Sequence, residues 1–304
     1  MNHGLLLINK ETGMTSHDVV ARLRRILQMK SIGHSGTLDP LASGLMVMLI
    51  GEATKLSQYI LEKNKGYIVR AQLGVETDSY DMTGKIVKTS DQKIALQTVR
   101  EAVLSLQGSM ELEVPIFSAT KVDGKKLYEY ARSETEVKIP KKTMRFYDVQ
   151  ILDQGEDWVD VSLSCSKGAF IRSWVHLLGK NLGIGASVAR LQRTISEPYE
   201  ISRSITLQEL EKNPDLMALK AFIPMSAVLP QQKILRVHGQ DQVMLGNGLI
   251  SHQLKNQLIG AYRPDPQSEE PALIKILSQK EGELLALIGL DPDKGFTIRR
   301  VFRY

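Results

Sequence analysis

The apolar positions of the chain fall into short runs and alternating stretches, which predict strands and amphipathic helices. Residues 4–8 form an apolar run typical of a buried strand. In residues 67–73 apolar and polar side chains alternate, so one face of this strand is expected to be apolar. Tyr67 lies on that face, at the start of the strand. Residues 157–165 alternate in the same way. Both stretches are therefore predicted to bury one face.

Helices are predicted where the apolar spacing changes to three and four residues. Thr15 or Ser16 begins the first helix, and Asp18 completes a capping box if Thr15 is the cap. Residues 55–61 are typical of a short helix, and another helix is expected to end near Gly108. A further helix follows residue 172, with Ser173 as its expected cap.

Two prolines, Pro224 and Pro230, interrupt this pattern and indicate a domain boundary. Residues 233–304 alternate short apolar runs with turns, which is typical of a small β-rich barrel or sandwich. The expected strands are Ile234–Val237, Leu273–Leu277, Leu284–Ile288 and Phe296–Val301, with turns at Gly246–Gly248, Pro264–Pro266 and Asp291–Gly295. The chain is thus expected to contain one domain over residues 1–230 and another over residues 233–304.

The composition adds limits on partners and compartment. A hydrophobic content of 42% and a charged content of 24% are ordinary for a globular protein. The net charge of +5 and the pI of about 9.1 favour a polyanionic partner. A single cysteine excludes an intrachain disulfide and a Cys-cluster zinc site. No run approaches the ~18 apolar residues of a membrane span, and the first residues lack a secretory pattern, so a cytoplasmic protein is expected.

The candidate chemistry lies in residues 33–51, GHSGTLDPLASGLMVMLIG. Tight turns are expected at Gly33, Gly36, Pro40 and Gly44. A stiff apolar run over residues 45–50 would hold this loop in place, with Asp39 at its centre and His34 five residues earlier. An Asp before a Pro is also a common turn former, and a lone His is often a hydrogen-bonded loop residue. Spacing alone leaves both interpretations open.

The run G-H-S-G-T-L-D-P-L-A-S-G, followed by G-E-A-T-K-L at residues 51–56, closely resembles the catalytic motif of the TruB family. Members of this family are bacterial synthases that convert uridine 55 in the T-loop of tRNA to pseudouridine. The resemblance implies that Asp39 is the catalytic nucleophile. It also implies that His34 contacts RNA and occupies the space left by the extruded base.

Three further segments carry the resemblance. N-K-E-T-G-M-T-S is similar to the first motif, which implies that Lys10 supports the loop, although Glu11 replaces the usual proline. The family's tyrosine at the place of Tyr67 stacks on the flipped base, and Tyr67 is also a candidate proton relay. K-G-A-F-I-R-S-W and G-I-G-A-S-V-A-R-L-Q-R-T are similar to the third motif. They imply that Arg172 forms an ion pair with the catalytic aspartate and that Leu191 is the floor of the site; the usual R-R pair appears as Gln192-Arg193.

Residues 121–145 contain eight Lys or Arg and four Asp or Glu, a net charge of +4, with tyrosines interleaved. Such a pattern suits RNA loops, and a solvated helix of mixed charge would also produce it. In bacterial members of the family the matching segment, about residues 115–145, is an insertion that clasps the tRNA elbow. The resemblance therefore implies RNA contacts at Lys121, Lys125, Lys126 and Tyr128.

The family also implies the fold, which is an α+β catalytic core with a mixed, mostly antiparallel sheet and flanking helices. A small PUA-like RNA-binding domain, rich in β-structure, is expected at the carboxy terminus. Residues 73–84, L-G-V-E-T-D-S-Y-D-M-T-G, are similar to another segment of the family. Asp78 and Asp81 in this segment are expected to form turns, and an RNA contact by them is left open.

Pseudouridine formation neither gains nor loses atoms or electrons, so no cofactor and no metal are expected. RNA uracil methyltransferases, by contrast, attack the base with a thiolate, but Cys165 falls on the apolar face of its predicted strand. The expected partner is the T-arm of tRNA, bound by a monomer without an obligatory protein partner. Two alternatives remain open, a guide-RNA-dependent uridine isomerase and a non-catalytic tRNA-folding chaperone. The basic segment argues against the first.

Overall fold

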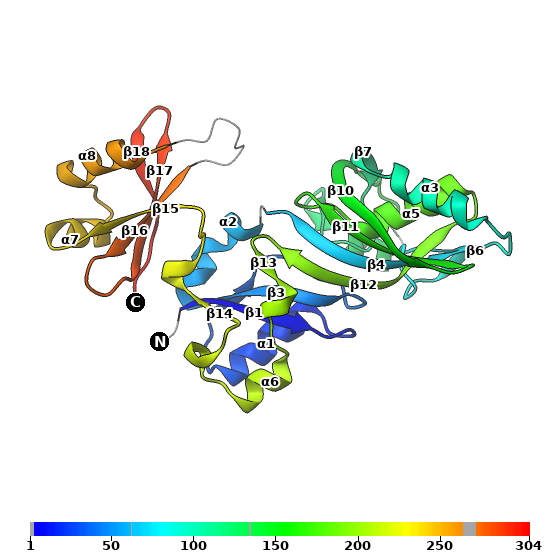
Figure 1. Ribbon diagram of the computed structural model, residues 1–304, viewed down its shortest axis with the longest axis horizontal. Helices are drawn as coiled ribbons and strands as arrows, with labels where there is room; N and C mark the ends of the chain where they lie inside the picture. Colours follow the sequence, from blue (N-terminus) through cyan, green and yellow to red (C-terminus); the bar gives the residue numbers. More distant parts are fainter. Residues whose placement is uncertain (1–2, 62, 134, 264–271) are drawn as a thin grey trace.

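The computed structural model describes residues 3–61, 63–133, 135–263 and 272–304. Most of the chain is built on one large twisted sheet, and the carboxy-terminal residues form a separate smaller sheet (Figure 1). Among the described residues no helix is long and apolar enough to cross a membrane.

The large sheet has the order β14-β1-β3-β12-β4-β11-β10-β7, with β13 added to β12 and β2 to β3. Its strands are β1 (Gly4–Lys10), β2 (Ile32–His34), β3 (Ser43–Ile50), β4 (Lys65–Leu73), β7 (Gly108–Glu113), β10 (Lys141–Gln154), β11 (Trp158–Cys165), β12 (Ala186–Ser196), β13 (Tyr199–Glu200) and β14 (Phe222–Pro224). Among the described pairs of this sheet, only β3 and β12 are parallel. The predicted mixed, mostly antiparallel sheet is therefore confirmed.

Helices cover the sheet in the places where the apolar stripes require them (Figure 1). The helix α1 (Ser16–Ile26) begins with Thr15 and Asp18 in the predicted capping box. It lies beside α6 (Leu207–Lys212). Arg22 of α1 donates two hydrogen bonds to the carboxylate of Glu211 in α6. The other flanking helices are α3 (Leu96–Ser105) and α5 (Ile171–Leu182). Trp174 of α5 is completely buried and donates its indole N–H to Leu106 at the end of α3.

Two helix predictions need correction. The helix α5 starts after Phe170, so Ser173 is not its cap. The Ser173 hydroxyl instead donates a 2.6 Å hydrogen bond to the carbonyl of Glu113, which ties the first turn of the helix to β7. The helix predicted over residues 55–61 begins earlier, as the 3-10 helix η1 (Gly51–Leu56), and continues as α2 (Ser57–Leu61).

The carboxy-terminal sheet has the order β15-β16-β17-β18. Its strands are β15 (Lys233–Val237), β16 (Leu273–Ser278), β17 (Leu284–Asp291) and β18 (Gly295–Val301), close to the four predicted runs. One open sheet is seen where a barrel or sandwich was expected, and two helices, α7 (Gln240–Gly246) and α8 (His252–Ala261), cover it. The predicted turn at Gly246–Gly248 is the end of α7, and the one at Pro264–Pro266 lies outside the described residues.

This small sheet is held against the large domain by its second face. Leu277, Leu284 and Leu287 belong to the hydrophobic core of the large domain, whereas Ile276 and Ile288 belong to the core under α7 and α8. The buried ammonium of Lys275 donates to the carbonyls of Ser226 and Val228, in the segment that joins the domains. Since a buried ammonium needs such acceptors, these bonds fix the connecting segment to β16.

The parallel contact between β3 and β12 depends on a glycine. Gly44 has φ +101°, and a Cβ atom built on it would lie 2.3 Å from the carbonyl oxygen of Arg193. Gly44 and Arg193 are partners in the strand register. The start of β3 can therefore approach β12 this closely only with a glycine at position 44.

We predict that Gly44→Ala lowers the free energy of unfolding by more than about 2 kcal/mol, because it adds a backbone clash to the cost of positive φ. Gly108→Ala is the matched control, since Gly108 has φ +98° with open space around its Cβ position. It should cost only about 1 kcal/mol. Urea unfolding measures both. Equal losses in the two variants would show that the contact with Arg193 contributes nothing.

Candidate active site

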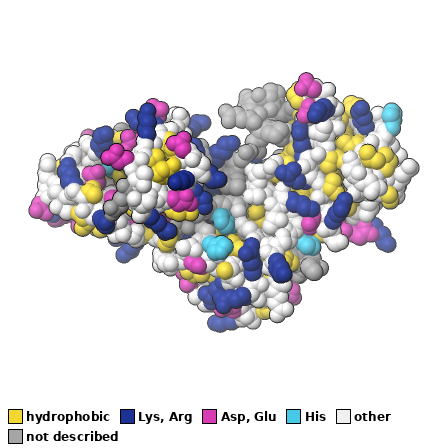
Figure 2. All heavy atoms as spheres, turned by 180° about the vertical axis from the view of Figure 1, so that it is seen from behind, with side chains coloured by type: hydrophobic (Ala, Val, Ile, Leu, Met, Phe, Trp, Pro, Cys, Tyr) yellow, Lys and Arg dark blue, Asp and Glu magenta, His cyan; other side chains and the backbone are white. Residues whose placement is uncertain are grey.

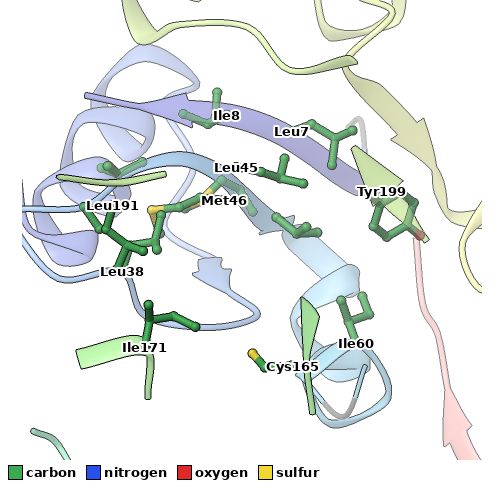
Figure 3. Packing of buried hydrophobic residues seen from close by; sticks show 14 of the residues in the cluster. Leu7, Ile8, Leu38, Leu45, Met46, Ile60, Cys165, Ile171, Leu191 and Tyr199 are labelled. Carbon is green, nitrogen blue, oxygen red and sulfur yellow. The ribbon is translucent and has the colours of Figure 1, made fainter. Parts of the chain in front are cut away.

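A pocket of about 360 Å³ lies where the loop before β3 meets β4, β12 and the start of α5. Its walls are Thr37, Leu38, Asp39, Tyr67, Ser118, Ala119, Thr120, Lys142, Gly168, Ala169, Phe170, Ile171, Arg172 and Leu191. Six separate segments of the chain thus converge on one hollow. Figure 3 shows Leu38, Met46 and Leu191 packed together, so the loop, β3 and β12 share the core beneath the pocket.

Asp39 and Arg172 form an ion pair in this pocket, with Nε of Arg172 2.9 Å from Oδ2 of Asp39. The side chain of Arg172 is only 5% exposed, whereas that of Asp39 is 37% exposed. The remaining guanidinium nitrogens donate to the carbonyls of Ser79 (3.1 Å) and Phe117 (2.9 Å). The cation is therefore fixed inside the protein, while the carboxylate is open to the pocket. This is the pairing that the resemblance implies for these two residues.

The backbone around Asp39 is held by the amino-terminal segment. Leu38 donates its N–H to the Ser16 hydroxyl, which in turn donates to the carbonyl of Leu38. The N–H of Gly13 donates to the carbonyl of Pro40 at 2.8 Å. Residues on both sides of Asp39 are thus bonded to the start of α1 and the turn before it, which restricts where its carboxylate can point.

Lys10 is fully buried at the end of β1, and its ammonium donates 2.8 Å bonds to the carbonyls of Glu11 and Met14. Burial lowers its pKa to about 8, and the nearby Asp39 carboxylate opposes this shift. The residue that replaces the usual proline, Glu11, accepts a 2.8 Å hydrogen bond from Gln208 of α6. Lys10 therefore braces the turn next to the Asp39 loop.

Tyr67 and Leu191 both line the pocket, as their predicted positions imply. Tyr67 lies on β4 at the register position opposite Arg193. Burial raises the pKa of Tyr67, so its hydroxyl stays protonated at neutral pH. Leu191 is buried on β12.

His34 lies at the end of β2, and it is not part of the wall of the pocket as described. Its Nδ1 accepts a hydrogen bond of 3.3 Å from the N–H of Gly36. Burial, assisted by the positive charge of Arg193, lowers the pKa of His34. The geometry thus shows a neutral, hydrogen-bonded loop histidine, and its role toward RNA stays a prediction.

The predicted RNA-contacting residues of the basic segment lie outside the pocket wall. Lys121 and Lys125 are exposed on a tight hairpin of β8 (Lys121–Val122) and β9 (Lys125–Lys126). Tyr128 lies in α4 (Leu127–Arg132), which follows directly. The ammonium of Lys126 donates a 3.2 Å hydrogen bond to the Tyr128 hydroxyl. This ammonium and the guanidinium of Arg132 each lie 5.3 Å from the centroid of the Tyr128 ring. Because residues 118–120 line the pocket, the hairpin is attached directly to its rim.

Sequence reasoning missed the roles of two further residues. Asp81 forms a turn, as predicted, because its Oδ1 accepts from the N–H of Thr83, but its Oδ2 also lies 3.6 Å from Arg172. Arg193 is buried beneath the loop, where its guanidinium donates to the carbonyls of Gly36, Thr37 and Leu45. The basic pair of the family motif, which falls on Gln192-Arg193, was the available signal for Arg193, whereas nothing in the spacing indicated that Asp81 reaches Arg172.

Comparison with known proteins identifies the class of protein to which this fold and site belong, the pseudouridine synthases. The chain is 54% identical over 304 residues to tRNA pseudouridine synthase B of Bdellovibrio bacteriovorus, covering 99% of this chain and 97% of that protein. It is 33% identical over 305 residues to tRNA pseudouridine synthase B of Clostridium kluyveri, covering 98% and 99%. The model of the TruB family pseudouridylate synthase N-terminal domain matches residues 24–171. The chain belongs to the TruB family.

Solved structures support the fold. The chain matches a structure of an H/ACA RNP bound to a substrate RNA containing 2′-deoxyuridine, with a TM-score of 0.72 and 21% identity. The match covers 99% of this chain and 85% of that one. A Cbf5-Nop10-Gar1 complex gives a TM-score of 0.70 at 22% identity over 99% and 84%. At these identities the likeness concerns the fold alone.

Cys165 is 1% exposed, and burial raises the pKa of its thiol to about 12. We predict that iodoacetamide does not alkylate Cys165 in the folded protein at about pH 8, and that alkylation becomes complete in denaturant. Mass spectrometry of the intact protein measures the adduct. Cys165→Ala, which removes the single thiol, is the control for background labelling. Rapid labelling of the folded protein would mean that the thiol is accessible and would reopen thiolate chemistry.

Proposed function

We propose that this protein isomerises uridine 55 in the T-loop of tRNA to pseudouridine, with Asp39 as the nucleophile. The observation that carries the proposal is the Asp39–Arg172 ion pair in a pocket, with the cation buried and the carboxylate open. The relatives named tRNA pseudouridine synthase B, one of them 54% identical over nearly the whole chain, support tRNA as the substrate. We further propose that the protein acts as a monomer in the cytoplasm, without cofactor, metal or obligatory partner.

The reaction breaks the bond between N1 of uracil and C1′ of the ribose, turns the base and joins C5 to C1′. The proton on C5 is lost and N1 gains one, so atoms and electrons balance. The Asp39 carboxylate can attack C1′ or C6, or stabilise positive charge at C1′. Arg172 holds the carboxylate at the pocket, because its Nε lies 2.9 Å from Oδ2 of Asp39 and its guanidinium is itself buried.

The target nucleotide must leave its stack to reach Asp39, which costs a few kcal/mol. Tyr67, on the wall of the same pocket, is suited to stack on the extruded base, and its protonated hydroxyl can take part in moving the proton from C5 to N1. Leu191 closes the floor. Lys10 supports the turn next to the loop that presents Asp39. His34, whose Nδ1 accepts a hydrogen bond from Gly36 of the same loop, would fill the place of the extruded base.

Contacts between the protein and the RNA backbone would offset the free-energy cost of flipping the target nucleotide. The exposed Lys121 and Lys125 of the hairpin, with Lys126 and Tyr128 behind them, adjoin the pocket and suit the phosphates of a T-arm. On the face seen in Figure 2, Lys and Arg side chains are distributed over both domains. A protein with its own basic hairpin beside the pocket has less need of a guide RNA, which favours a synthase that acts alone.

Asp39→Asn should reduce pseudouridine formation on an unmodified T-arm stem-loop by at least about 10⁴-fold, because the amide is a poor nucleophile. RNA affinity should change little. Carbodiimide-dependent primer extension measures the product, and filter binding measures affinity. Asp91→Asn, at an exposed aspartate, is the matched control and should retain full activity.

Pseudouridine formation by the rigorously purified Asp39→Asn variant would contradict the assignment of Asp39 as the nucleophile. Tight binding by the wild type without any product would favour the chaperone, or a missing guide RNA. Adding total cellular RNA to the reaction separates these two, since only the guide-dependent enzyme would become active.

Lys121→Gln and Lys125→Gln should each weaken binding of the T-arm, because each removes one phosphate contact. Each should also make the negative slope of log affinity against log salt less steep, by about 0.7–1. Titrations at several salt concentrations measure the slope. Lys212→Gln, at an exposed lysine of α6, is the control and should leave the slope unchanged. Unchanged slopes in both hairpin variants would contradict RNA contact by this segment.

A further inference from the structure

One polar group on the wall of the pocket has no protein partner. The residue Ser118 is 6% exposed, and its hydroxyl oxygen is buried and finds no hydrogen bond among the described residues. Ser118 lines the same pocket as Asp39, Tyr67 and Arg172. Burying an unpaired hydroxyl is unfavourable, and such a group in a binding pocket points to a ligand that completes its bonding.

Three other buried serines close to this site use their hydroxyls. Ser16 donates to the carbonyl of Leu38, Ser79 to Asp81 and Ser173 to the carbonyl of Glu113. The hydroxyl of Ser118 differs from them, since it shares their burial but not their bonding. Packing alone therefore does not account for a serine at this position, where alanine would fill nearly the same space.

The position of Ser118 is fixed by backbone bonds on both sides. The carbonyl of Phe117, immediately before it, accepts a 2.9 Å hydrogen bond from Arg172. The carbonyl of Ser118 itself accepts from the N–H of Tyr128 at 3.1 Å, and that of Thr120 accepts from the N–H of Leu127 at 2.8 Å. One end of this short segment is thus bonded to the partner of Asp39, and the other end to the helix α4. The hydroxyl is held in a preformed place.

We propose that the Ser118 hydroxyl donates a hydrogen bond to an oxygen of the extruded uridine, either a uracil carbonyl or the ribose 2′-hydroxyl. This inference rests on the proposed function and adds a substrate-contacting residue to it. Uracil presents carbonyl oxygens at C2 and C4, and both persist in pseudouridine, so one fixed donor can serve substrate and product. Because the carbonyl of Ser118 is bonded to α4, the basic segment and the nucleotide contact form one structural unit.

The test is Ser118→Ala, measured by single-turnover pseudouridine formation and by thermal unfolding of the free protein. We expect turnover to fall about 10-fold, the range of one neutral hydrogen bond, while the Tm of the free protein stays the same or rises. The rise follows because the variant no longer buries an unpaired hydroxyl. Ser105→Ala, which removes an exposed hydroxyl at the end of α3, outside the pocket wall and the basic segment, is the matched control and should keep full turnover.

Modified substrates locate the contact. T-arm stem-loops are prepared with 2′-deoxyuridine, 2-thiouridine or 4-thiouridine at the target position, and each is assayed with the wild type and Ser118→Ala. On the substrate whose contacted oxygen is replaced, Ser118→Ala should cause no further loss of turnover, whereas on the other two the losses should multiply. Multiplicative losses on all three substrates would contradict the inference.

Two further outcomes overturn it. Equal turnover by Ser118→Ala and the wild type would show that the hydroxyl contacts nothing that matters to the reaction. A lowered Tm together with lowered turnover would show that Ser118 supports the fold. The wild type and Ser105→Ala test the proposed function separately, because their inactivity on the unmodified stem-loop would refute that function and not the role of Ser118 within it.

Discussion

The buried charge of Arg172 is the interaction on which the pocket depends. A guanidinium inside a protein is stable only when it is paired and hydrogen-bonded. The partners of Arg172 come from three distant segments: Asp39 before β3, Ser79 and Asp81 in the turn after β5 (Val75–Thr77), and Phe117 ahead of the basic hairpin. These segments must all be in place before the cation at the start of α5 can be buried. Assembly of the pocket and neutralisation of one charge are therefore the same event.

The two partners of the central ion pair differ in exposure, and this difference is what the proposed chemistry requires. Arg172 has bonds to backbone carbonyls on its other nitrogens, so it cannot follow Asp39 out of the pocket or swing toward a phosphate. Asp39 has one oxygen against the cation and a side chain that is partly open. A carboxylate held in this way can meet a nucleotide without first breaking a network around itself.

Local patterns predicted the local structure well. The apolar run of β1, the alternation of β4 and β11 and the capping box of α1 follow from residue spacing, because neighbouring side chains alone decide them. Tertiary contacts overrode local signals elsewhere, as when Ser173 bonded to β7 and did not cap α5. The helices α7 and α8 were missed because each buries few apolar side chains, so their periodicity is weak. The convergence of Asp39, Tyr67, Arg172 and Leu191 came from the family resemblance, since no periodicity encodes contacts between such distant positions.

The replacement of the usual proline by Glu11 shows how the Asp39 loop tolerates a change in its support. A proline restricts a turn through its own ring, whereas this turn is restricted by bonds. The ammonium of Lys10 holds the carbonyls of Glu11 and Met14, and the N–H of Gly13 holds Pro40 next to Asp39. The carboxylate of Glu11 takes a further bond from Gln208 of α6. The turn is thus connected to the loop on one side and to a helix on the other, and its geometry does not depend on a rigid residue at position 11.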